Sequence, residues 1–219
     1  MSEISSKLPV QLRRRRDPNQ TRSREAVERI LDASAYLLAE HGVEKLTTRR
    51  IASRAEVNVS TLYQFFPNKH AIIYALYEDW LETAKDVFEN ADDALPAAVD
   101  WPSFFTAIMK DMRQVELSAD LKTRLKQAMS VYEDLRALDH EHAQWAIGKI
   151  SAYIHHFAPQ CPHDCCRSIA ILMLDRDFNL ADHQLRHGPE LLERLDRLTL
   201  ESVLHLLSHC IEQKKLCAE

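Results

Sequence analysis

Hydrophobic side chains recur every three or four residues along most of this chain, which is the spacing of one face of an α-helix. From Thr21 or Ser23 the apolar positions form one stripe that reaches Gly42, where glycine favours the left-handed conformation that ends helices. A second stripe follows Asn68, a residue suited to capping a helix that runs from Lys69 to about Asn90. The pattern predicts long amphipathic helices rather than strands.

The rest of the chain keeps the same periodicity. The pattern there predicts helices over residues 101–117, 119–137, 139–157, 163–185 and 189–215. Only three glycines occur in 219 residues, which leaves little of the turn chemistry that β-hairpins need. We therefore expect an all-α fold of roughly nine helices.

Two short helices separated by a three-residue break stand between the two long stripes. Thr47 and Thr48 offer hydroxyl caps for a helix of two turns that ends at Ala55, and a second short helix runs from Val59 to Phe66, before Pro67. This arrangement is typical of a helix-turn-helix, here over residues 47–66, in which one helix braces the DNA backbone while the next enters the major groove.

The order of residues in this segment resembles a known family. Residues 24–84 are similar to the homeodomain-like three-helix DNA-binding domain of TetR-family transcriptional regulators. The positions that carry the resemblance are Leu46, Thr47, Thr48, Arg49, Ile51, Ala52, Ala55, Val57, Thr61, Leu62, Tyr63, Phe66, Asn68, Lys69, Ala71 and Ile72. One departure is Glu56, which stands where the family usually has glycine. A left-handed backbone at that position would strain a glutamate modestly.

The resemblance implies which side chains contact DNA. Thr48 and Arg49 are expected at the start of the bracing helix, near a phosphate or a base edge. In the recognition helix, the methyl groups of Val59 or Thr61 can contact thymine, and the amide of Gln64 can pair with adenine. The phenol of Tyr63 and the ammonium of Lys69 are expected to hold phosphates. The expected DNA-binding residues are Thr48, Arg49, Val59, Ser60, Thr61, Tyr63, Gln64 and Lys69.

The distribution of charge separates a basic N-terminal part of the chain from an acidic remainder. The net charge is −5, yet Arg13–Lys69 holds twelve basic and seven acidic residues, and the body that follows is acidic. We expect a flexible basic arm over 1–20, a DNA-binding domain over 21–84, and an effector-binding and dimerisation domain over 85–219. The run Arg13–Arg16 suits either a minor-groove contact or a solvated tail.

The acidic body is expected to contain the effector site and the dimer interface. Apolar residues lie on more than one face of the last two predicted helices, about 163–185 and 189–215, which in TetR-like proteins pair across a homodimer. The resemblance implies a small-molecule pocket among the middle helices, and methionine and aromatic side chains there suit an apolar or aromatic ligand. The candidate ligand-binding residues are Phe105, Met109, Met129, Tyr132, Trp145 and Tyr153.

These features predict a ligand-responsive repressor that a small molecule releases from a palindromic operator. A metal- or thiol-responsive regulator that uses Cys161, His163, Cys165 and Cys166 is the alternative, because cysteine and histidine ligate zinc and copper. A helical enzyme is a third hypothesis, but the chain lacks a Gly-rich phosphate loop, a nucleophile elbow and an HExxH signature. We expect no catalytic residues, no cofactor, and a cytoplasmic location with reduced cysteines.

Overall fold

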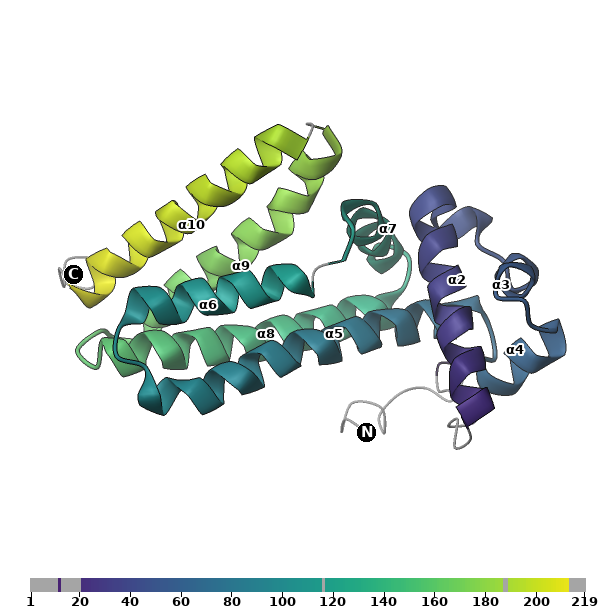
Figure 1. Ribbon diagram of the computed structural model, residues 1–219, viewed down its shortest axis with the longest axis horizontal. Helices are drawn as coiled ribbons and strands as arrows, with labels where there is room; N and C mark the ends of the chain where they lie inside the picture. Colours follow the sequence, from purple (N-terminus) through teal and green to yellow (C-terminus); the bar gives the residue numbers. More distant parts are fainter. Residues whose placement is uncertain (1–11, 13–20, 116, 187–188, 213–219) are drawn as a thin grey trace. The chain divides into compact units, whose positions relative to one another are not determined.

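The computed structural model describes residue 12 and residues 21–115, 117–186 and 189–212. These residues form nine α-helices and one 3-10 turn, and no strand is present among them, which confirms the all-α prediction (Figure 1). The elements are α2 (Thr21–Lys45), α3 (Thr48–Arg54), α4 (Val59–Phe65), α5 (Lys69–Ala94), η1 (Leu95–Ala97), α6 (Trp101–Gln114), α7 (Ala119–Met129), α8 (Glu133–Phe157), α9 (His163–Arg186) and α10 (Pro189–Ile211). The run Arg13–Arg16 lies outside the described residues.

The described residues fall into two compact units. Unit 1 holds those up to Trp80 together with Asp120–Arg136, and therefore includes α2, α3, α4, the first half of α5 and α7. Unit 2 holds Leu81–Ala119 and the residues from Ala137 onward. The division differs from the expected boundary after residue 84, because α7 belongs to the unit that contains the helix-turn-helix.

Gly42 interrupts α2 near its C-terminal end. Its φ of 74° and ψ of 174° are not helical, and helical residues then resume as far as Lys45. Arg124 of α7 lies beside this point, where its Nε donates to the carbonyl oxygen of Ala39 at 3.5 Å. The prediction that glycine breaks the helix is confirmed, although one short turn follows the break.

The segment predicted as one helix over 119–137 is two helices. α7 stops at Met129, and α8 begins at Glu133, six residues before the predicted start at Asp139. In the break, the Ser130 hydroxyl donates to the carbonyl oxygen of Gln127 at 2.7 Å. The Tyr132 ring stacks on His70 with 3.9 Å between ring centroids, so α5 and this break are held together within unit 1.

Unit 2 is built around aromatic side chains. Phe104 of α6 meets Tyr153 of α8 edge to face at 5.3 Å between centroids, and Phe157 lies 5.5 Å from Phe104. α9 and α10 run side by side in this unit (Figure 1). Among the described helices, none is long and apolar enough to cross a membrane.

Candidate nucleic-acid interface and effector cavity

Local capping fixes the two short helices of the predicted DNA-binding motif. The side chain of Thr47 accepts a hydrogen bond from the Arg50 amide at 3.3 Å and begins α3. Asn68 accepts from the Ala71 amide at 2.8 Å and caps α5, as the sequence predicts. Between α3 and α4 the backbone of Glu56 has a φ of 55°, the left-handed conformation expected where the family has glycine.

α4 buries one face and exposes the other. Leu62 of α4 is fully buried inside unit 1, and so is Phe66, which directly follows the helix. The exposed face carries Val59, Ser60, Tyr63 and Gln64, and the side chain of Thr61 is half-buried at its edge. The exposed set brings together a methyl-bearing side chain, a hydroxyl, a phenol and an amide, which are the groups that read base edges and hold phosphates.

Three of the predicted DNA-contacting residues also make contacts within unit 1. The Thr48 hydroxyl lies 3.0 Å from the Tyr63 hydroxyl, which links the start of α3 to the exposed face of α4. The Lys69 ammonium donates to the carbonyl oxygen of Val43 at 3.0 Å. An ammonium has three donors, so this bond positions Lys69 and leaves donors for a phosphate.

The three arginines of α3 differ in what they contact. Arg50 donates to the carbonyl oxygen of Lys45 at 3.0 Å. The guanidinium of Arg54 stacks 3.3 Å from the centroid of the Tyr36 ring. Arg49 is exposed in the first turn, beside Thr48. Of the three, Arg49 is therefore best suited to contact an anion outside the protein.

Unit 2 encloses a cavity of about 40 Å³. Its walls are apolar apart from one phenol and come from five helices, and they consist of Phe88, Phe105, Ile108, Met109, Met112, Ile150, Tyr153, Met173, Leu174 and Val203. The volume is far below the roughly 300–1,000 Å³ of sites for drug-sized ligands. Three methionines line the wall, and their flexible side chains allow such a cavity to enlarge.

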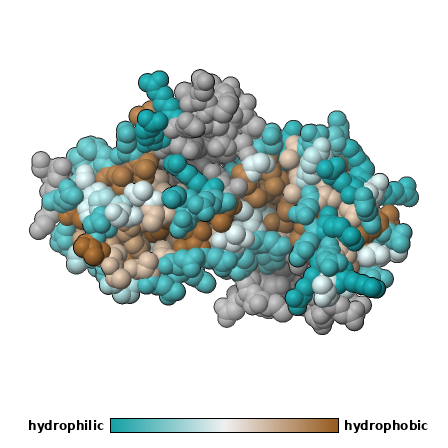
Figure 2. Space-filling view, in the orientation of Figure 1, coloured by the Kyte–Doolittle hydropathy of each residue, from teal (hydrophilic) through white to brown (hydrophobic). Residues whose placement is uncertain are grey.

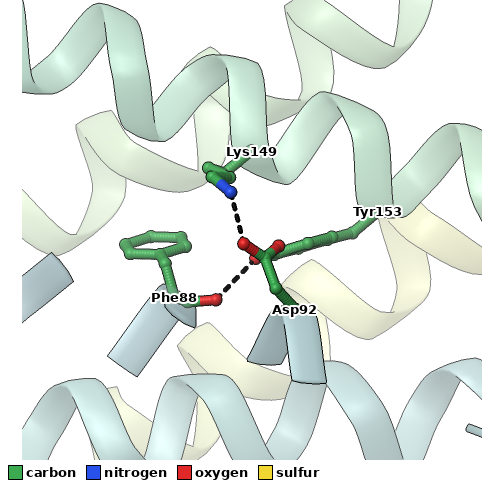
Figure 3. A network of polar contacts seen from close by, with 4 residues as sticks. All are labelled: Phe88, Asp92, Lys149 and Tyr153. Atoms are coloured by element: carbon green, nitrogen blue, oxygen red, sulfur yellow. Dashed lines mark hydrogen bonds and ion pairs between the residues drawn. The ribbon is translucent and has the colours of Figure 1, made fainter. Parts of the chain in front are cut away.

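A polar network anchors one wall of this cavity (Figure 3). Tyr153 donates its hydroxyl to Asp92 Oδ1 at 2.8 Å and lies 3.0 Å from the carbonyl oxygen of Phe88, and Lys149 pairs with the same carboxylate. Burial and the hydrogen bond to Asp92 raise the pKa of Tyr153. Burial works to raise the pKa of Asp92, but hydrogen bonds from Lys149 and Tyr153 outweigh it and lower that pKa. The phenol therefore stays neutral and oriented toward Asp92.

The structure brings together only part of the predicted ligand set. Phe105, Met109 and Tyr153 line the cavity. Trp145 is not in the lining and instead meets Phe88 edge to face at 5.3 Å. Met129 and Tyr132 belong to unit 1, at the break after α7. Sequence reasoning missed Met173 of α9 as a lining residue, because helical spacing does not distinguish a cavity wall from ordinary core.

Four cysteines converge where α9 begins and α10 ends. The sulfurs of Cys161, Cys165 and Cys210 all lie within 4.8 Å of one another, and Cys166 is the buried neighbour of Cys165. His163, which the sequence grouped with these cysteines, stacks on His155 with 4.3 Å between ring centroids. Cys210 was not predicted for this cluster, because nothing local in the sequence connects it to Cys161.

Comparisons with known proteins agree with this geometry. Residues 30–76 match the profile described as bacterial regulatory proteins, tetR family. The class A tetracycline repressor protein from Escherichia coli transposon 1721 is 38% identical over 90 residues, which cover 41% of this chain and 39% of that protein. The class G tetracycline repressor protein of Vibrio anguillarum is 26% identical over 191 residues, covering 84% and 82% of the two chains.

Solved structures share the fold beyond the DNA-binding segment. A TetR transcription regulator from Haloarcula marismortui aligns with a TM-score of 0.67 at 14% identity, over 86% of this chain and all (100%) of that one. A TetR-family regulator from Streptomyces coelicolor aligns with a TM-score of 0.58 at 24% identity, over 84% and 99%. The capped helix pair, the left-handed turn and the matching profile together identify residues 30–76 as a DNA-binding segment similar to that of the tetR family of bacterial regulatory proteins.

Proposed function

We propose that the protein is a ligand-responsive transcriptional repressor that binds a palindromic operator in the cytoplasm. The observation that supports this most directly is the exposed face of α4, where Val59, Ser60, Tyr63 and Gln64 stand together over a buried apolar face. Arg49 and Lys69 lie at the first turns of the helices on either side and supply cations for the phosphates. No step in this proposal requires catalysis.

A homodimer through α9 and α10 completes the proposal. Ile171 and Leu172 on α9 and Leu198 on α10 are 37%, 51% and 50% exposed, which is unusual for large apolar side chains on core helices. Hydrophobic side chains also reach the surface on the visible face of unit 2 (Figure 2). A two-fold pairing of such faces presents two α4 helices to successive turns of a duplex.

The cavity in unit 2 is the proposed effector site. Its apolar walls favour an apolar or aromatic molecule, and the neutral Tyr153 phenol is the polar group that such a ligand would meet. Because the cavity holds only about 40 Å³, binding requires the methionine-lined walls to open. We propose that this opening favours the conformation of the dimer that releases DNA.

Selection of bound duplexes from a random pool tests the proposed function. We expect enrichment of a palindrome whose half-sites are about one helical turn apart. Gln64→Ala is then expected to relax the preference at one base pair in each half-site, with a loss of about 1–3 kcal/mol at that pair. Recovery of no preferred sequence by the folded dimer would refute sequence-specific operator binding.

A further inference from the structure

The cavity of unit 2 offers a ligand very little hydrogen-bonding chemistry. Among its lining side chains only Tyr153 carries an oxygen or nitrogen atom, and the three methionines add thioether sulfurs, which are weak acceptors. Every lining residue lies inside α5, α6, α8, α9 or α10, so its backbone amide is committed to a bond within its own helix. The polar chemistry of the cavity is therefore that of the Tyr153 hydroxyl.

The single hydrogen of this hydroxyl is already in use. Tyr153 donates toward Asp92 Oδ1 at 2.8 Å and toward the carbonyl oxygen of Phe88 at 3.0 Å, and both of these atoms are acceptors (Figure 3). A phenol has one hydrogen to donate, so only the lone pairs of the Tyr153 oxygen are left for a ligand. The lining side chains thus present acceptors and no available donor.

Asp92 keeps the phenol hydrogen in this position. Its side chain is 38% exposed and that of Lys149 is 31% exposed, so their ion pair stays in contact with water, whereas Tyr153 is 1% exposed. Burial works against ionisation of Asp92, but hydrogen bonds from Lys149 and Tyr153 outweigh it and lower the pKa of the carboxyl group. At neutral pH the carboxylate is ionised and can only accept. A ligand carboxylate in the cavity would find no donor and would be buried without a partner, which is costly.

We propose that the cavity selects an uncharged, mainly apolar molecule that donates one hydrogen bond, from a hydroxyl or an N–H group, to the oxygen of Tyr153. Molecules whose polar groups only accept hydrogen bonds are disfavoured, because those groups would be left unpaired. Asp92 is a positioning residue that acts through Tyr153. This inference rests on the proposed effector site, but it concerns the chemistry of the ligand and is tested without DNA.

Calorimetric titration with toluene, benzyl alcohol, benzaldehyde and benzoate tests the proposal, because these probes share one ring skeleton and differ in their polar group. The wild type and Met173→Ala are both titrated, since truncation of this lining methionine gives the ring more room than the cavity of about 40 Å³. Benzyl alcohol is expected to bind more tightly than benzaldehyde, and benzoate is expected not to bind.

The outcomes of this titration separate the inference from the proposed function. If both folded proteins bind none of the four probes, the inference and the effector site are overturned together. If the probes bind without a preference for the alcohol over the aldehyde, the inference alone is overturned. If the alcohol is preferred but does not alter operator binding, the inference stands and the proposed response to a ligand is contradicted.

Substitutions at the phenol and its partner identify the groups responsible, in whichever background binds benzyl alcohol. Tyr153→Phe is expected to lower affinity for the alcohol roughly three- to tenfold, the usual effect of one hydrogen bond, and to change benzaldehyde and toluene by less than about twofold. Tyr36→Phe is the matched control, because it removes a phenol hydroxyl from α2 and keeps the ring on which Arg54 stacks. It should bind every probe as its parent does.

Asp92→Asn removes the charged acceptor of the phenol hydrogen, which can then turn toward the cavity. This variant is expected to raise affinity for benzaldehyde relative to benzyl alcohol, and an unchanged ratio would contradict the role of Asp92. Equal losses of alcohol and aldehyde binding in Tyr153→Phe would contradict the proposal, because they would show that the hydroxyl donates to the ligand. If Tyr153→Phe unfolds, the preference among the four probes decides.

Discussion

The hydroxyl oxygens of Thr48 and Tyr63 lie 3.0 Å apart, across the turn that joins the two helices of the DNA-binding motif. The contact ties the first residue of α3 to the exposed face of α4. It therefore couples the residue expected near a phosphate to the helix expected in the groove. Both partners were predicted to contact DNA, but their contact with each other was not.

A double-mutant cycle measures this link. Thr48→Val and Tyr63→Phe each remove one hydroxyl at nearly constant shape. We expect a coupling of about 0.5–1 kcal/mol in the free energy of unfolding, the usual net value of a partly exposed hydrogen bond. The measurement is urea denaturation of the four proteins. Strict additivity of the two substitutions would show that the contact does not stabilise the motif.

Glu56 offers a test of backbone strain. Its φ of 55° places a Cβ in the left-handed region, which costs about 1 kcal/mol relative to glycine. Glu56→Gly is expected to raise the free energy of unfolding by roughly that amount. Glu56→Ala is the matched control, since it removes the same carboxylate but keeps the Cβ, and it should leave stability nearly unchanged. Equal gains from both variants would attribute the effect to charge instead.

Exposed leucines of α9 and α10 test the proposed dimer. Leu172→Glu combined with Leu198→Glu is expected to give a folded monomer, because charges on both faces would be buried without partners in the interface. Val99→Glu alters a side chain that is 97% exposed and serves as the control, which should stay dimeric. Sedimentation reports the mass. A double variant that still dimerises would place the interface elsewhere.

His142 predicts a pH dependence of stability. Burial, with a smaller contribution from Lys85, lowers its pKa from 6.5 to about 4, and Glu82 opposes the shift. The unfolded chain then binds more protons than the native state between pH 6.5 and 4, so stability falls as the pH drops through this window and is constant above it. We expect a loss on the order of 3 kcal/mol, because each pKa unit corresponds to about 1.4 kcal/mol. The His142→Gln variant should lose less of its free energy of unfolding between pH 6.5 and 4. If the variant loses as much as the wild type, His142 is not the source of the pH dependence.

Local signals account for what the sequence predicted well. The Thr47 and Asn68 caps act within three residues of their own positions, and Gly42 is read from backbone preference alone. These rules depend on neighbours in the chain, which the sequence displays directly. The motif over 47–66 followed from these caps. The fold class followed from helical periodicity, and the DNA-facing residues of α4 followed from the family resemblance. The left-handed position at Glu56 was inferred from the same resemblance, because the family usually has glycine there.

Long-range packing accounts for the rest. No proline or glycine marks the break between α7 and α8, where Tyr132 stacks on His70 sixty-two positions earlier. The sulfur of Cys210 meets that of Cys161 across forty-nine positions. Met129 has the same residue type and periodicity as Met109, yet the two lie in different units. Such pairings depend on how helices assemble, which periodicity does not encode.

The salt dependence of operator binding in Arg49→Ala tests most directly whether the α3–α4 surface contacts DNA. Lys110→Ala is the matched control, because it removes one exposed cation from α6 in unit 2. With both proteins dimeric, Arg49→Ala is expected to weaken binding and to reduce the slope of log K against log salt by about 0.9 per protomer, while Lys110→Ala changes neither. Equal behaviour of the two variants would contradict the assignment of this surface to DNA.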